Sequence, residues 1–159
     1  NDNVISDTTN DILKLVVYNR YQDMKPAIGF IKNIGLKEGA LASTVSHDSH
    51  NIVAVGTSDE EIVSAINHII ASTGGILACN KDNVLLLPLP VGGLMSAEEG
   101  DVIAQKYEEL DAAVKQMGSQ LKAPFMTVAF MSLLVIPKLK LSDQGLFDGR
   151  TYAFTDLMI

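Results

Sequence analysis

The chain has 159 residues, of which 47% are hydrophobic and 19% are charged, and its formal net charge is −7. This length suffices for one well-buried core and is short for two ordinary domains, so we predict a single domain. The negative charge excludes a broad basic surface for nucleic-acid phosphates. The sole cysteine, Cys79, cannot form an internal disulfide, which favours a reducing compartment and the cytoplasm.

The N-terminal segment is polar and lacks both the basic and the apolar region of a signal peptide. We predict that residues 1–11 are a leader, either disordered or adjacent to a tag, and that the domain spans residues 12–159. The first residue is Asn1 rather than an initiator methionine, so we expect the chain to be a piece of a larger protein. The longest apolar stretch, residues 125–136, is shorter than the roughly 20 residues that cross a bilayer, so we predict no membrane span.

Strands dominate the first third of the predicted structure. Residues 12–18 and 27–36 are rich in β-branched and apolar side chains, as is typical of strands. A long apolar run, residues 39–56, is interrupted by a polar cluster. We interpret this run as two strand halves, or as one strand with a bend at Asp48 and Ser49.

Two capping-box patterns predict two principal helices. In Ser58-Asp59-Glu60-Glu61 the serine hydroxyl accepts from the backbone N–H three residues later, and isoleucines follow at helical spacing up to Gly74. The segment 96–99 has the same pattern and predicts the start of the longest helix, which ends at Gly118. Between the helices, residues 76–79 and 84–87 predict a β-hairpin.

The remaining segments complete an α+β prediction. Residues 88–95, with two prolines and two glycines, predict an ordered apolar loop. The run 125–136 fits a short buried helix and a buried strand equally well. An edge strand at 138–141, a turn at 142–145 and a last strand within 150–157 follow. We therefore predict a single α+β domain, with the two principal helices packed on one face of a mixed β-sheet.

The polar cluster contains His47, Asp48, His50 and Asn51 and has three interpretations. A metal site is one, but alternation along a strand separates the two histidines, and no second Cys or Glu cluster supplies further ligands, so we predict no metal here. A second interpretation is a catalytic or substrate-orienting histidine. The third is that these side chains bond the loop backbone and hold a bend. For Cys79, with apolar neighbours, we predict an inert buried thiol.

Several blocks in this order resemble the C-terminal domain of bacterial adenine deaminases. The resemblance extends from about residue 12 to the end, although Ser46 replaces the usual Ala and the segment after Arg20 lacks a His that many members carry. The blocks are Asn19-Arg20, Gly29-Phe30-Ile31, the segment 39–57 with its HDSHN core, LPLPVGGLMS at 87–96, PFMT at 124–127, VIPKLK at 135–140 and SDQGLFD at 142–148.

The resemblance implies a parent amidohydrolase of purine metabolism that converts adenine and water to hypoxanthine and ammonia. It also implies a preceding TIM-barrel domain that holds manganese or iron, which 159 residues cannot contain. We therefore expect this chain to be inactive alone and to need no cofactor of its own. We expect the cluster formed by His47, Asp48, His50 and Asn51 to contact or cover the barrel's active site.

An alternative is a non-catalytic oligomerisation or docking module, since an exposed apolar loop with polar neighbours is typical of an interface. We expect a homo-oligomer and no nucleic-acid or membrane partner. The interface candidates are Pro88, Leu89, Pro90, Leu94 and Met95, together with the apolar run after Pro124.

Overall fold

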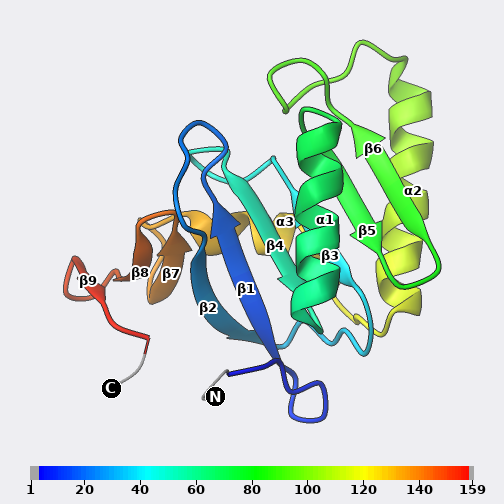
Figure 1. Ribbon diagram of the computed structural model, residues 1–159. Helices are drawn as coiled ribbons and strands as arrows, with labels where there is room; N and C mark the ends of the chain where they lie inside the picture. The colour runs from blue at the N-terminus through cyan, green and yellow to red at the C-terminus, as the bar shows by residue number, and fades with distance from the viewer. Residues whose placement is uncertain (1–3, 158–159) are drawn as a thin grey trace.

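A six-stranded antiparallel sheet forms the centre of the computed structural model, which describes residues 4–157 (Figure 1). Its strand order is β2-β1-β4-β3-β5-β6. The α+β class is confirmed, but the expectation of a mixed sheet is wrong. A helix connects β4 to β5. These two strands run parallel to each other, but β3 lies between them and pairs antiparallel with both. The strands are β1 (Ile12–Tyr18), β2 (Ala27–Lys32), β3 (Ala40–Ser43), β4 (Ile52–Gly56), β5 (Gly75–Cys79) and β6 (Val84–Pro88).

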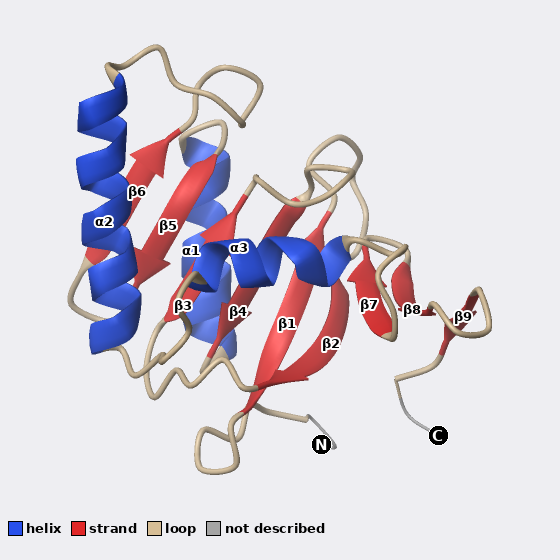
Figure 2. Cartoon of the chain, turned by 180° about the vertical axis from the view of Figure 1, so that it is seen from behind, coloured by secondary structure: helices blue, strands red, loops and turns tan. Residues whose placement is uncertain are grey.

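Helices cover both faces of this sheet, whereas we predicted them on one. Helix α1 (Asp59–Ala71) lies on one face, and α2 (Gly100–Gln116) and α3 (Pro124–Ala129) lie on the other (Figures 1 and 2). The central strands are apolar on both sides for this reason. All five residues of β4 are buried, with Val53 and Val55 in the core under α2 and α3 and Ala54 in the core under α1.

The two predicted capping boxes have different outcomes. The Ser58 hydroxyl accepts from the backbone N–H of Glu61 at 3.2 Å and begins α1, as predicted. The second prediction is wrong, because α2 begins only at Gly100 and its N-cap, Glu99, makes no side-chain capping bond. The hydroxyl of Ser96 instead accepts from the Glu98 N–H at 3.2 Å and stabilises a turn before the helix.

The ambiguous apolar run 125–136 is helical in its first part. Helix α3 is followed by a 3-10 turn, η1 (Phe130–Ser132), and Pro124 occupies the first turn of α3, where its missing N–H leaves no bond unmade. Beyond η1 a small antiparallel sheet contains β7 (Leu139–Ser142), β8 (Gly145–Asp148) and β9 (Ala153–Thr155). The predicted turn at 142–145 joins β7 to β8, a strand that we did not predict.

Two predicted boundaries differ from the structure. The second strand ends at Lys32 rather than Leu36, because Asn33 and Gly35 adopt positive φ angles of 65° and 84°. The predicted leader, residues 1–11, lies within the described residues from residue 4 onward. The hydroxyl of Ser6 donates to the Gly56 carbonyl at 2.9 Å and accepts from the Lys14 N–H at 2.8 Å. Ser6 is therefore bonded to β1 and β4, and the domain boundary at residue 12 stays a prediction.

Candidate functional site

The polar cluster lies in a loop, residues 44–51, that joins β3 to β4. These strands pair antiparallel from Ala40 opposite Gly56 to Ser43 opposite Val53, which favours the interpretation as two strand halves. The connections 19–26, 72–74 and 89–99 leave the sheet at the same end, because Tyr18 pairs with Ile52 and Gly75 pairs with Pro88. Four connections therefore gather at this end of the sheet.

The loop brings His47 and His50 to the same side, which strand alternation would have prevented. Their ring centroids lie 6.1 Å apart, and the His47 ring lies 4.9 Å from that of Phe130 in η1. His50 adopts a positive φ of 52°, a conformation uncommon for a residue with a Cβ atom. Its N–H donates to the Ser46 carbonyl at 2.7 Å, which closes a turn around the exposed Asp48.

Hydrogen bonds attach the loop to η1, which lies on the face of the sheet opposite α1. The hydroxyls of Ser46 and Ser132 lie 2.5 Å apart, and the Ser132 hydroxyl also lies 3.0 Å from the His47 carbonyl. The His47 N–H donates to the carbonyl of Ala129 at 3.2 Å. Both serines are buried, so these bonds fix the base of the loop.

Two polar atoms of the cluster are buried without a hydrogen-bond partner among residues 4–157. They are Oδ1 of Asn51, a residue only 1% exposed, and Nδ1 of His50. The Asn51 amide donates through Nδ2 to the Ser49 hydroxyl at 3.1 Å, and exchanging its oxygen and nitrogen would leave the N–H₂ group unpaired instead. An unmade bond of this kind costs about 1–3 kcal/mol.

The described residues do not form a metal centre. Between residues 4 and 157, no three His, Cys, Asp or Glu side chains lie together in a way that could hold an ion. The pair His47 and His50, with Asp48 exposed beside them, is too small a donor set for a structural or catalytic metal. The manganese or iron that the resemblance implies therefore does not fit the donor set that residues 4–157 provide.

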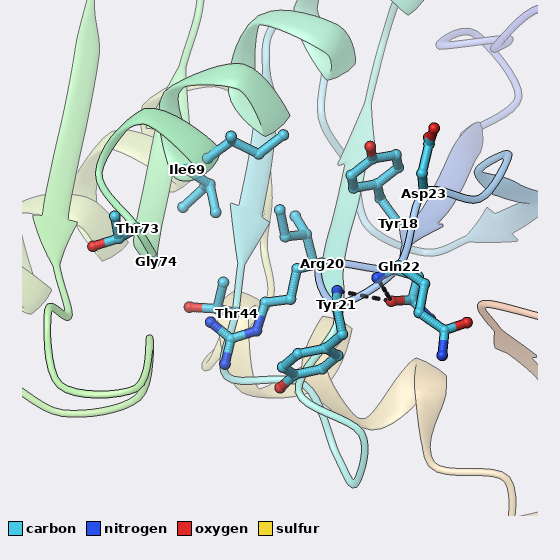
Figure 3. A pocket seen from close by; sticks show the side chains of 12 residues that line it. Tyr18, Arg20, Tyr21, Gln22, Asp23, Thr44, Ile69, Thr73 and Gly74 are labelled. Atoms are coloured by element: carbon cyan, nitrogen blue, oxygen red, sulfur yellow. Dashed lines mark hydrogen bonds between the residues drawn. The ribbon is translucent and has the colours of Figure 1, made fainter.

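A cleft of about 580 Å³ opens beside the loop, on the face of the sheet that carries α1. Its wall contains Tyr18, Tyr21 and the end of α1, and the Arg20 side chain extends across it toward Thr44 (Figure 3). The Arg20 guanidinium lies 5.0 Å from the centre of the Tyr21 ring, and its Nη2 donates to the Gly92 carbonyl at 2.5 Å. Sequence reasoning gave no indication of this contact, which joins residues 72 positions apart.

The predicted interface residues of loop 88–95 divide into two groups. Pro88, Pro90 and Met95 are exposed, Met95 to 59%, and Leu94 is half-buried. Leu89, in contrast, is 5% exposed and belongs to the core. Leu89 therefore contributes to stability, and the loop offers its other apolar side chains to the surface.

Cys79 lies at the end of β5 and is buried, with 3% of the residue exposed. Burial, and to a smaller extent the nearby Glu61 carboxylate, raise the pKa of its thiol to about 11. This thiol is not a nucleophile at neutral pH, in agreement with the sequence-based prediction.

Comparison with known proteins decides the family. The profile of the family described as the adenine deaminase C-terminal domain matches residues 1–153. The chain belongs to this family. An adenine deaminase of Methanosarcina barkeri is 54% identical over 99% of this chain, and one of Sulfurovum is 53% identical over 95%. An adenine deaminase of Borreliella afzelii is 48% identical over 95%. The chain spans 28% of the length of each of these three relatives.

Three of the blocks that carried the resemblance to adenine deaminases meet in space. Arg20 follows β1, the HDSHN block forms loop 44–51, and Gly92 and Gly93 belong to the LPLPVGGLMS block. The Thr44 hydroxyl lies 2.5 Å from the Gly93 carbonyl, and Arg20 contacts the carbonyl of Gly92. The candidate site of this adenine deaminase C-terminal domain is therefore the end of the sheet where these three segments converge.

Proposed function

We propose that this chain is the C-terminal domain of an adenine deaminase, in which it packs on a preceding catalytic domain and covers its active site. The reaction would replace the 6-amino group of adenine with oxygen, giving hypoxanthine and ammonia. The support is that the relatives above are adenine deaminases and that the chain spans only 28% of the length of each. The sheet end with loops 44–51 and 88–95 would face the catalytic domain.

The observation that carries this proposal is the polar loop with its unpaired buried atoms. Oδ1 of Asn51 and Nδ1 of His50 have no hydrogen-bond partner within residues 4–157, whereas buried polar groups in folded proteins are usually paired. His47, which is half-buried, and Asp48, which is exposed, lie beside them. A small shift of the loop against a second domain would pair these atoms and present the histidines to that domain's site.

The residues of this chain would act by contact and exclusion of water rather than by holding a metal. The donor set around His47 and His50 is too small for an ion, so we propose that manganese or iron belongs to a preceding TIM-barrel domain. Active sites in such barrels lie at the C-terminal ends of their strands, where a polar loop from an adjacent domain can cover them. Covering the site would exclude bulk water and strengthen the polar contacts inside it.

The test compares the 159-residue chain with the full-length enzyme that the proposal requires, using ammonia release from adenine with added manganese. The chain alone should be inactive. In the full-length enzyme, Asp48→Ala should lower kcat/KM at least about tenfold, equivalent to about 1.4 kcal/mol of transition-state stabilisation. The matched control is Asp82→Ala, which removes an exposed carboxylate in the β5–β6 turn. Equal activity of both variants would refute the role of loop 44–51.

A second candidate function is a non-catalytic oligomerisation or docking module. The exposure of Val91 and Met95, 46% and 59%, at the tip of loop 88–95 favours it. In that case the chain would form a homo-oligomer, and substitutions in loop 44–51 would change stability but leave kcat/KM unchanged.

No helix within residues 4–157 is long and apolar enough to cross a membrane. A cytoplasmic location remains a proposal that the single thiol motivates.

A further inference from the structure

The backbone at the tip of loop 88–95 is hydrogen-bonded by two side chains that are distant in the sequence. Nη2 of Arg20 donates to the Gly92 carbonyl at 2.5 Å, and the hydroxyl of the buried Thr44 lies 2.5 Å from the Gly93 carbonyl. The same Thr44 hydroxyl accepts from the Gly75 N–H at 2.9 Å. Two consecutive carbonyls of the tip are thus bonded to the ends of β1 and β3.

At Gly93 the Arg20 guanidinium occupies the space that a Cβ atom would need. A Cβ atom on Gly93 would lie 2.0 Å from Nη1 of Arg20, and one on Gly74 would lie 2.4 Å from the Gly93 Cα. Gly93 also has a φ of 75°, which glycine adopts without strain. The Arg20 guanidinium therefore packs directly against the Gly93 backbone, and any side chain at position 93 would displace it.

The loop also bonds to itself, so that its apolar tip has one defined shape. The N–H groups of Leu94 and Met95 donate to the Val91 carbonyl, each at 3.1 Å, and the Val91 N–H donates to the Met95 carbonyl at 3.0 Å. This turn directs Val91 and Met95 outward, where they are 46% and 59% exposed. Ordering such a surface before binding reduces the entropy lost on association.

Arg20 has no acidic partner within residues 4–157, so its charge is not used in an ion pair of this domain. Its hydrogen-bond partner is the Gly92 carbonyl, while its Nε is buried without one, and the guanidinium stacks near Tyr21. An arginine on the surface for solubility alone would extend into solvent. This arginine instead holds the backbone of the loop.

We propose that Arg20 is a positioning residue, which fixes the tip of loop 88–95 as a preformed contact surface for the preceding catalytic domain. This inference rests on the proposed function and names the part of the surface that makes the contact. Val91 and Met95 form the contact, Arg20 and Thr44 hold it in place, and the cleft beside Arg20 provides the space through which the side chain reaches the loop.

Oxidation of methionine by hydrogen peroxide measures this contact directly, because exposed methionines react and covered ones are protected. Met95 is 59% exposed in this chain, and Met126 on α3, 58% exposed, is the matched control. Oxidation rates of both would be measured in the 159-residue chain and in the full-length enzyme. Each protein would be prepared as wild type, Arg20→Gln and Arg20→Lys.

The expected result is at least about fivefold protection of Met95 on passing from the chain to the full-length enzyme. Arg20→Gln should abolish that protection, and Arg20→Lys, which keeps the charge but loses the planar fork, should restore part of it. The rate at Met126 should be the same in the wild type and both variants. Amide exchange of β6 in the chain checks that each variant is folded, and Arg20→Lys provides the test if Arg20→Gln is not.

Two results would overturn the inference. Equal protection of Met95 in the wild type and in both variants would mean that the loop docks without the arginine, which leaves the proposed function intact. Equal rates at Met95 in the chain and in the full-length enzyme would mean that this surface contacts nothing. The activity of loop 44–51 variants tests the proposed function independently of either result.

Discussion

The buried hydroxyl of Ser46 lies 2.5 Å from that of Ser132, 86 residues further along the chain. This contact attaches the polar loop 44–51 to the turn η1, which lies on the face of the sheet opposite α1. Ser132 has further acceptors in the carbonyls of His47 and Ala129, whereas Ser46 has Ser132 as its hydroxyl partner. The two serines therefore differ in what their removal leaves unpaired.

Ser132→Ala should destabilise the chain more than Ser46→Ala. The first substitution leaves the buried Ser46 hydroxyl unpaired and should lower the free energy of unfolding by about 1–3 kcal/mol. The second leaves Ser132 with its carbonyl acceptors and should cost about 0.5–1.5 kcal/mol. Urea denaturation of both single variants and the double variant measures the coupling. Equal effects of the two single substitutions, with no coupling, would show that the hydroxyls act independently.

Cys79 should be unreactive toward a thiol reagent at neutral pH until the chain unfolds. Burial raises its pKa from the ordinary 9.0 to about 11, so the folded state binds the proton more tightly than the unfolded state. Stability due to this thiol is therefore present below pH 9 and is lost as the pH rises toward 11, by up to about 1.4 kcal/mol per pH unit. Cys79→Ala should remove this part of the pH dependence. Rapid labelling of the native wild type at pH 7 would contradict the assignment.

Met95→Asp and Leu94→Asp should dissociate a homo-oligomer if loop 88–95 forms its interface, because each places a charge in an apolar contact. Leu89→Asp is not a useful probe, since Leu89 is buried in the core and its replacement would unfold the domain. Light scattering of the chain gives the oligomer size, and Val63→Asp, at a similarly exposed residue of α1, is the control. An oligomer that survives both loop substitutions must use another surface.

Local patterns predicted those elements that their own residues determine. The strands β1 and β4 and the helix α1 follow from apolar runs and from the Ser58 cap. The same local reasoning failed at residues 96–99, where the serine pattern caps a turn instead of α2. It also placed the helices on one face, although the absence of polar alternation in β4 is the signal of a strand that is covered on both sides.

The candidate site was predictable only in part. The density of polar residues at 47–51 identified the loop, but period-two alternation placed its histidines on opposite faces, because the run was treated as a strand. The contacts Arg20 to Gly92 and Thr44 to Gly93 join residues 72 and 49 positions apart. Such pairings depend on strand order, which no local pattern in a single sequence specifies.

The most direct test of the central claim is kcat/KM for adenine in the full-length enzyme carrying His50→Ala, beside a His68→Ala control. His68 is exposed on α1, whereas His50 belongs to loop 44–51 with its unpaired Nδ1. We predict that His50→Ala lowers kcat/KM at least about tenfold while His68→Ala retains wild-type activity. Wild-type kinetics of His50→Ala, accompanied only by a lowered melting temperature, would contradict the account and leave loop 44–51 a purely structural turn.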